Sequence, residues 1–440
     1  MSPPVKKEIR LLLPAWIAAM LLAIASFLLT IGNVGTVLPD TPGDLQIFFL
    51  LLAATLLGIA SFGQEFNSGT FTLLLSQPIE RHRIWTIKTT VLAVAFASVL
   101  LTLLISWELH LFHFYFNWRV LWTILRYVGL SALCAFVFFS GGLWTTLSLR
   151  RTSEAFWLTL LTPVILMAMV FAISEYFHSS DQVNNYVVPA VFLIYSLAGF
   201  FWARRLFLRA QDLQWTGGVI AIPSRKKIAE GTTASSRRHH WISALVWKEL
   251  QLQQVNILIA AVVLALHLAS VVVRQVHPNF YNPNVIGLLE LIWVLWLAMP
   301  LLIGSAAVAE EHRIGIVESQ LCLPVSRRAQ FVIKFFVGLV LSLVLGGLMP
   351  FIVERGHDLN YYIFVVAAVI FFISFYASTL ARTTLQAIGV SMVVSVAIYL
   401  YEASTVIKVL RLGGNWSIEQ VGLELLRLYL GIPILGLVLS

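Results

Sequence analysis

Charge is scarce in this sequence. Only 11% of its 440 residues are charged, whereas soluble globular domains carry roughly 25%, and 59% of the residues are hydrophobic. A chain of this composition would expose large apolar patches to water and aggregate. The low charge content therefore excludes a soluble protein and predicts an all-α integral membrane protein.

Cysteine and catalytic motifs are also scarce. The two cysteines are Cys134, in an apolar run, and Cys322, beside Arg327 and Arg328, and there is no CxxC pair. This pattern argues against a disulfide framework and a zinc site. The sequence also lacks the phosphate-binding pattern GxxxxGK[ST] and the metal-protease pattern HExxH. We therefore expect no catalytic residue, cofactor or metal site in this chain.

Twelve apolar runs approach the length of about 20 residues that a membrane-spanning helix needs. The last of them is the weakest. The predicted spans are 11–32, 45–62, 89–111, 125–148, 156–176, 187–207, 254–273, 285–308, 331–352, 361–381, 384–401 and 423–440.

The basic residues predict the orientation of these spans. The net charge is +8, and a cytoplasmic N-terminus places most of the 29 lysines and arginines on the cytoplasmic side, as the positive-inside rule requires. There they would meet anionic lipid, so we expect membrane lipid, and no nucleic acid, as their partner. The sixth span ends in a basic anchor, Arg204 and Arg205. The equivalent anchor of the twelfth span would lie beyond Ser440, so we expect the natural chain to continue past this residue.

The sequence contains an internal repeat. Seven residues recur at one constant spacing, and each half also opens with Lys-Glu, at Lys7-Glu8 and Lys248-Glu249. Because six spans separate the two starts, the halves are predicted to be parallel. We expect halves at 1–210 and 246–440, joined by a cytoplasmic linker at 211–245. The recurring pairs are Glu65/Glu311, Gly69/Gly315, Leu75/Leu321, Pro78/Pro324, Arg81/Arg327, Ile87/Ile333 and Lys88/Lys334.

A polar interruption follows the second span of each half, at residues 65–83 and 311–329. In the first, Phe71, Leu74 and Leu75 have helical spacing, and Pro78 can stop the helix. In the second, Ser326 is a plausible N-cap for the ninth span. Each interruption is predicted to form a short, stiff helix at the cytoplasmic surface. The alternative is an ordinary polar connector.

The Lys-Glu start, the six spans and the E…G…LL…P-[IV]-x-R loop resemble the permease subunits of type-2 ABC exporters, here with two permeases fused in tandem. The resemblance implies that each interruption is a coupling helix that docks on a cytosolic ABC ATPase, with an amphipathic elbow helix before the first span of a half. The coupling residues would be Glu65, Gly69, Thr70, Leu74, Pro78, Arg81, Glu310, Glu311, Gly315, Pro324, Arg327 and Arg328.

The same resemblance implies that this chain is the permease of an ATP-driven exporter that works by alternating access. Two copies of a separate ATPase would bind ATP and Mg²⁺, and the family's usual location is the bacterial cytoplasmic membrane. Glu108, His267 and Glu290 are candidates for a substrate path because ionisable residues in spans often serve function. The alternatives are headgroup contacts for the two glutamates and a packed core group for the histidine.

Three other functions stay open. An ion-coupled secondary transporter can also have two parallel six-helix halves, but it usually carries acidic residues and broken helices near the membrane midplane. A membrane-embedded enzyme would need a catalytic constellation that the sequence does not show. A membrane anchor or sensor would fit the same spans.

Overall fold

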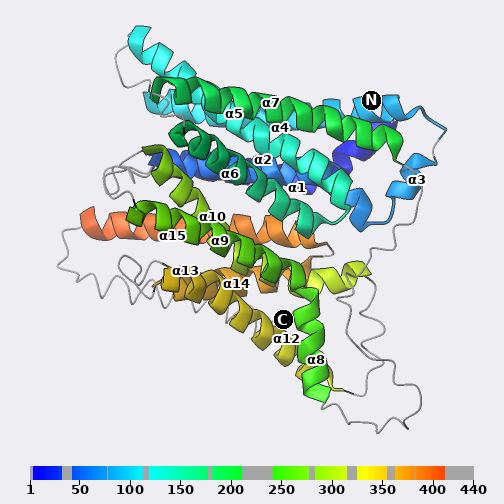
Figure 1. Cartoon of the computed structure of the whole chain (residues 1–440). Helices are drawn as coiled ribbons and strands as arrows, with labels where there is room; N and C mark the ends of the chain where they lie inside the picture. The colour runs from blue at the N-terminus through cyan, green and yellow to red at the C-terminus, as the bar shows by residue number, and fades with distance from the viewer. Residues whose placement is uncertain are drawn as a thin grey trace.

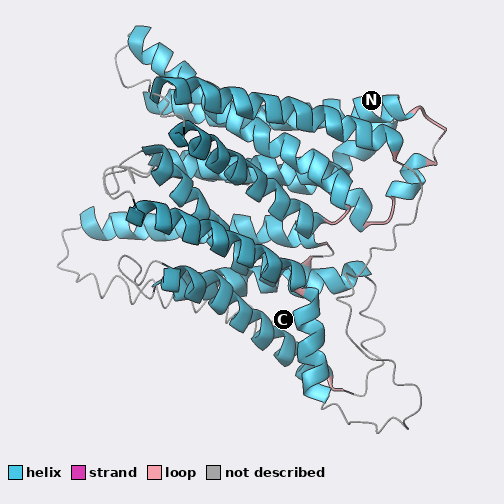
Figure 2. Cartoon of the chain, viewed as in Figure 1, coloured by secondary structure: helices cyan, strands magenta, loops and turns pink. Residues whose placement is uncertain are grey.

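The computed structural model describes residues 3–31, 42–76, 78–111, 118–176, 181–210, 241–276, 283–314, 325–353, 362–381 and 383–411. Long helices make up nearly all of these residues, and no strand occurs among them (Figure 2). This all-helical content is expected for a membrane protein, because a helix satisfies its own backbone hydrogen bonds in hydrocarbon.

Eleven long helical segments run roughly alongside one another (Figure 1). The helices are α1 (Pro3–Ile31), α2 (Pro42–Asn67), α3 (Phe71–Leu75), α4 (Arg81–Leu111), α5 (Trp118–Leu149), α6 (Thr152–Tyr176), α7 (Asp181–Arg209), α8 (Trp241–Leu252), α9 (Gln254–Val276), α10 (Pro283–Ile314), α12 (Arg327–Leu343), the π-helical turn η2 (Val344–Leu348), α13 (Met349–Val353), α14 (Tyr362–Leu380) and α15 (Thr384–Arg411).

Nine of the helical segments in the described part of the chain are long and apolar enough to cross a membrane. The prediction of an all-α, multi-pass membrane protein is therefore confirmed. The first eleven predicted spans coincide with long helices, most of which extend past the apolar run because a helix can continue into the headgroup region. The twelfth, 423–440, lies outside the described residues. Residues 241–245, assigned to the linker, instead begin α8.

Taken in chain order as two groups, the helices share two pairings. In the first group, α1 to α7, helix α2 packs on α5, and α5 packs on α6. In the second group, α8 to α15, helix α10 packs on α14, and α14 packs on α15. The groups meet where α1 and α2 contact α15 and where α6 contacts α10. A change in the position of α1 therefore acts directly on the contact between the groups.

Each group contains a close helix crossing that depends on glycine. A Cβ added at Gly58 of α2 would lie 2.5 Å from the carbonyl oxygen of Phe139 in α5. A Cβ at Gly304 of α10 would meet Ser374 and lie 3.0 Å from the carbonyl oxygen of Phe371 in α14. Small residues permit such close backbone approach inside a membrane.

The start of the first span differs between the groups. In the second group, α8 is a separate helix that runs across the direction of the bundle, and the turn at Gln253 joins it to α9 (Figure 1). In the first group, α1 continues without a break from Pro3 to Ile31. The second group thus has an element in the position of the expected elbow helix. Helices α3 and α8 lie at the same end of the bundle (Figure 1).

Candidate functional site

The first polar interruption forms a short surface helix, α3, between α2 and α4. Gly69 has a φ of +66°, a backbone conformation that glycine adopts without a steric penalty, and it allows the chain to turn out of α2. Of the predicted apolar stripe, Phe71 and Leu74 are buried and Leu75 is half-buried, whereas Leu73 is 64% exposed. The aromatic ring of Phe71 packs against Phe66, with centroids 4.4 Å apart. One face of α3 is therefore anchored, and the opposite face is open.

The start of α4 is tied to the end of α7 by Arg81. Its Nη1 atom donates hydrogen bonds to the carbonyl oxygens of Leu208, at 3.1 Å, and Ala210, at 2.7 Å. These carbonyls lie at the C-terminal end of α7, where a positive charge is favourable. Arg81 therefore fixes the far side of the α3 loop, while Pro78 between the two helices is exposed.

The second polar interruption is described only at its ends. Gly315 and Pro324 lie outside the described residues. The predicted N-cap is confirmed, because the Ser326 hydroxyl accepts a hydrogen bond of 3.3 Å from the backbone N–H of Ala329. Arg327 and Arg328, which follow it, are exposed at the start of α12.

A buried charge cluster joins α1, α2 and α4 next to α3. We call it the first cluster, formed by Lys7, Glu8, Glu65 and Lys88. Lys88 Nζ lies 2.7 Å from Glu8 Oε2 and 3.1 Å from Glu65 Oε2. Lys7 Nζ lies farther away, 3.6 Å from Glu65 Oε1. Glu65 is only 1% exposed, so it holds three helices together and does not form part of the outer surface.

Two lysines and two glutamates also meet in the second group. The second cluster is formed by Lys248, Glu249, Glu311 and Lys334, from α8, α10 and α12. Lys248 Nζ lies 2.7 Å from Glu311 Oε1, and Lys334 also forms an ion pair with Glu311. Lys248 additionally lies 3.6 Å from Glu249. Glu311 is 2% exposed and thus occupies the same central place as Glu65.

Burial sets the electrostatics of both clusters. Charges removed from water need close partners, because the desolvation penalty amounts to several kcal/mol per ion. Burial raises the pKa of Glu249 above its ordinary value, and the neighbouring Glu311 carboxylate raises it further, while Lys334 and Lys248 oppose the shift. In each cluster both glutamates are buried, but only one of the two lysines is. The positions of the lysines therefore decide how well the buried carboxylates are stabilised.

The sequence marked these residues as members of a repeat but did not show that they meet. Lys88 and Glu8 are far apart in sequence, so their contact depends on helix packing. One signal could have found it: Lys88 lies close to a long apolar run, and an ionisable residue near a span needs a partner. Glu310, also predicted, accepts a hydrogen bond of 3.1 Å from Thr384 of α15. Thr70 precedes α3 and is partly exposed.

Of the three candidates for a substrate path, only His267 has a described side chain. His267 of α9 is buried, and its Nδ1 accepts a hydrogen bond of 3.1 Å from Trp296 Nε1 in α10. This contact is typical of a packed core histidine, the alternative that the sequence left open. Glu108 and Glu290 belong to α4 and α10, but their side chains lie outside the described part of the structure.

A hollow of about 260 Å³ lies beside α3. It is lined by Phe66 and Phe71 together with Arg150 and Arg209, and also by Leu147, Leu206 and Ala210. The hollow combines apolar walls with two basic side chains. Such a lining suits a partner that carries acidic side chains.

No family model, curated protein or solved structure matches this chain. The functional conclusion therefore depends on the chain's own residues and their geometry.

Proposed function

We propose that this chain is the permease of an ATP-driven ABC exporter, in which two six-span units in tandem couple ATP hydrolysis on a separate ATPase to transport by alternating access. The membrane would be the bacterial cytoplasmic membrane, with the N-terminus and α3 on the cytosolic side. One observation carries the proposal: the surface helix α3, which has an open face, adjoins a buried cluster of two lysines and two glutamates, and a cluster of the same composition forms in the second group.

The contacts provide a path for mechanical coupling. A displacement of α3 moves the helices that it joins, α2 and α4. Glu65 of α2 and Lys88 of α4 both belong to the first cluster, and Lys88 is hydrogen-bonded to Glu8 of α1. Helix α1 in turn contacts α15 of the other group. Movement at the surface can therefore change the contact between the two groups.

The open surface suits a protein partner. Leu73, Thr72 and Pro78 are exposed around α3, and Arg150 and Arg209 line the adjacent hollow. An ATPase that docks here would insert apolar residues against Leu73 and place acidic residues near the arginines. The second cluster supports an equivalent docking place in the second group, and hence two ATPase copies related by a pseudo-twofold axis.

ATP binding would act by shifting a conformational equilibrium. Moving a two-state transporter from a 1:99 to a 99:1 ratio requires about 5.5 kcal/mol of differential binding. The ATPase dimer would supply this free energy through both docking places. The first cluster would keep α1, α2 and α4 together, and the second would keep α8, α10 and α12 together, so that each set of helices moves as one body.

The test is the exposed face of α3. The full chain would be co-expressed with each Walker-motif ATPase from its source genome, purified as a complex and placed in proteoliposomes. Leu73→Asp should lower permease-stimulated ATP turnover at least about tenfold, because a charge on the open face opposes an apolar contact. Its thermal stability should match that of wild type, since Leu73 is exposed.

Two control variants make this test specific. Leu73→Met keeps the apolar character and should retain stimulated ATP turnover. Leu74→Asp places a charge at a buried position and should lower the unfolding temperature, which separates loss of folding from loss of docking. The proposal would be wrong if the Leu73→Asp complex hydrolysed ATP and transported like wild type, or if no such ATPase bound the chain.

A further inference from the structure

The two places where the helix groups meet can be compared position by position. Helices α6 and α15 begin at Thr152 and Thr384, and both threonines are buried. Counted from these starts, Trp157 of α6 and Gly389 of α15 occupy the same position. The α6 contact therefore has an indole side chain at the position where the α15 contact has only the hydrogen of a glycine.

At the α6 contact, Trp157 closes the gap between the groups. It is fully buried, and its Nε1 donates a hydrogen bond of 2.8 Å to Asn256 Oδ1 in α9. Asn256 is itself bonded to Gln253, whose amide nitrogen donates to the carbonyl oxygen of Ile303 at 3.3 Å. This contact is filled and its polar atoms are paired.

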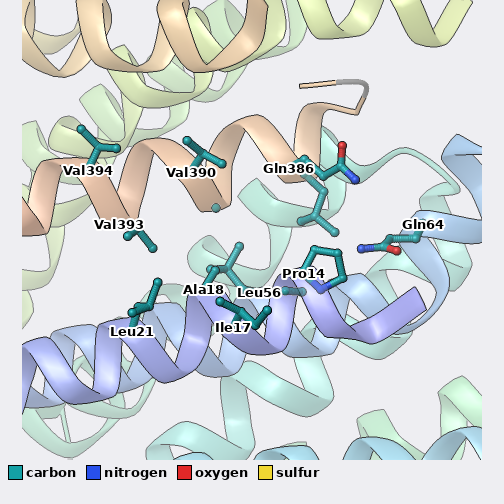
Figure 3. Close-up of a pocket in the computed structure, with 13 residues that line it drawn as sticks. Pro14, Ile17, Ala18, Leu21, Leu56, Gln64, Gln386, Val390, Val393 and Val394 are labelled. Atoms are coloured by element: carbon teal, nitrogen blue, oxygen red, sulfur yellow. The ribbon is translucent and has the colours of Figure 1, made fainter. Parts of the chain in front are cut away.

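At the α15 contact, a cavity takes the place of the tryptophan. It has a volume of about 210 Å³ and lies between α1, α2 and α15 (Figure 3). A Cβ at Gly389 would be 3.6 Å from the Cβ of Ala18, which is an ordinary contact distance. A methyl group would therefore fit without strain, whereas an indole would fill the space.

The walls of the cavity are apolar and open toward the surface that faces lipid. Ile17, Leu21 and Val390 line it and are exposed to the outside of the bundle. A hydrocarbon chain in the bilayer can therefore enter from the side. An apolar cavity of this kind is not held open by water, so hydrocarbon is the occupant that its walls favour.

One end of the cavity is polar but uncharged. The side-chain amides of Gln64 and Gln386 lie at this end (Figure 3), close to the end of α2 and the start of α15. None of the described residues that line the cavity carries a charge. At the position in α6 that corresponds to Gln386 stands Glu154, which is paired with Arg151 at 2.6 Å. The cavity thus has amide donors and acceptors where the other contact has an ion pair.

We propose that this cavity binds one hydrocarbon chain of a single-chain amphiphile with an uncharged, hydrogen-bonding head, as in a monoacylglycerol. The chain lies along α1 and α15, and the two glutamine amides bind the hydroxyl or ester oxygens of the head. The volume is below the roughly 300–1,000 Å³ of common ligand pockets, so it takes one chain and not two. The site stands independently of the proposed transport function.

The test uses the purified full chain in nanodiscs of phosphatidylcholine with a photoactivatable C16 monoacylglycerol. Saturable labelling is expected on peptides of α1 and α15. Gly389→Trp should lower it about tenfold or more by filling the cavity, whereas Gly389→Ala should not. Val340→Trp, which adds the same bulk at an exposed position of α12, is the matched control and should label like wild type.

A second variant tests the polar end without filling the cavity. In Gln64→Leu/Gln386→Leu, labelling by the monoacylglycerol should fall several-fold, while labelling by a photoactivatable C16 hydrocarbon without a head should stay unchanged. Equal losses for both probes would overturn the assignment of the head. Labelling that is non-saturable over all lipid-facing helices, or undiminished in a folded Gly389→Trp variant, would overturn the site.

Discussion

The two charge clusters contain the same residue types but differ in how their lysines are placed. In the first cluster, Lys88 holds both Glu8 and Glu65, while Lys7 stays 3.6 Å from Glu65. In the second, two lysines lie close to Glu311, because Lys248 approaches it to 2.7 Å. The carboxylates of the first cluster therefore depend on a single buried ammonium group. In the second cluster, two ammonium groups compensate the charge of Glu311.

The largest expected effect comes from removing that single group. Lys88→Met would leave Glu8 and Glu65 buried without their close cation, and the loss of one partner of a buried ion pair costs about 3–5 kcal/mol. Lys334→Met should cost clearly less, because Lys248 still contacts Glu311. Thermal and denaturant unfolding of the purified variants in the same detergent would measure the difference.

A double variant checks the cause of this loss. Adding Glu65→Gln to Lys88→Met removes a carboxylate that has lost its close cation and should recover part of the stability, as coupled sites do. Equal losses for Lys88→Met and Lys334→Met would contradict the difference inferred between the clusters.

An intermediate effect is expected at the two glycine crossings. Gly58→Ala should destabilise by about 1–3 kcal/mol, because the new methyl group meets the carbonyl oxygen of Phe139 and the backbone cannot easily retreat. Gly304→Ala should destabilise as well, but Ser374→Ala should relieve part of it by removing the hydroxyl that the methyl group meets. Unfolding temperatures of the single and double variants would show this.

The glycine prediction has a simple control. Gly129 of α5 has no atom within 4 Å of an added Cβ, so Gly129→Ala should leave the unfolding temperature nearly unchanged or slightly raised, as helix propensity favours alanine. A loss at Gly129 as large as at Gly58 would mean that close packing is not the cause.

The smallest effect is a pH dependence in the second cluster. The pKa of Glu249 is raised from an ordinary value of 4.5, so its ionised form destabilises the folded state at neutral pH. As the pH falls through the raised pKa toward 4.5, the folded state takes up the proton first, and this residue's contribution becomes more favourable. Glu249→Gln, which mimics the neutral form, should remove this part of the pH dependence.

The measurement is the unfolding temperature of wild type and Glu249→Gln from pH 7 down to the ordinary pKa of 4.5. The unfolding temperature of the variant should exceed that of wild type at pH 7, and this excess should shrink as the pH falls. An excess that does not shrink over this range would contradict a raised pKa.

Local features of this fold were predictable from the sequence. The apolar runs predicted the positions of the long helices. The helical spacing of Phe71 and Leu74 predicted the apolar face of α3, and Ser326 predicted the start of α12. Each depends on neighbours within a few residues. The short helix was also predicted between the correct pair of spans.

Features that depend on packing were not predictable. The contact of Lys88 with Glu8 depends on how α4 is aligned along α1. No local sequence pattern predicts that alignment. The correspondence of Trp157 with Gly389 becomes visible only when the first residues of α6 and α15 are known. The repeat did indicate Glu65 and Glu311, but as surface coupling residues, whereas the structure places both in the interior.

Trp157 at one group contact and Gly389 at the other occupy corresponding positions, and this difference has a genetic consequence. In an assembly of two identical copies, one codon sets both contacts, so a large residue could not close one without closing the other. Here two separate codons in one reading frame specify them. The contact at Trp157 can thus stay filled while the contact at Gly389 keeps a cavity that can bind a ligand.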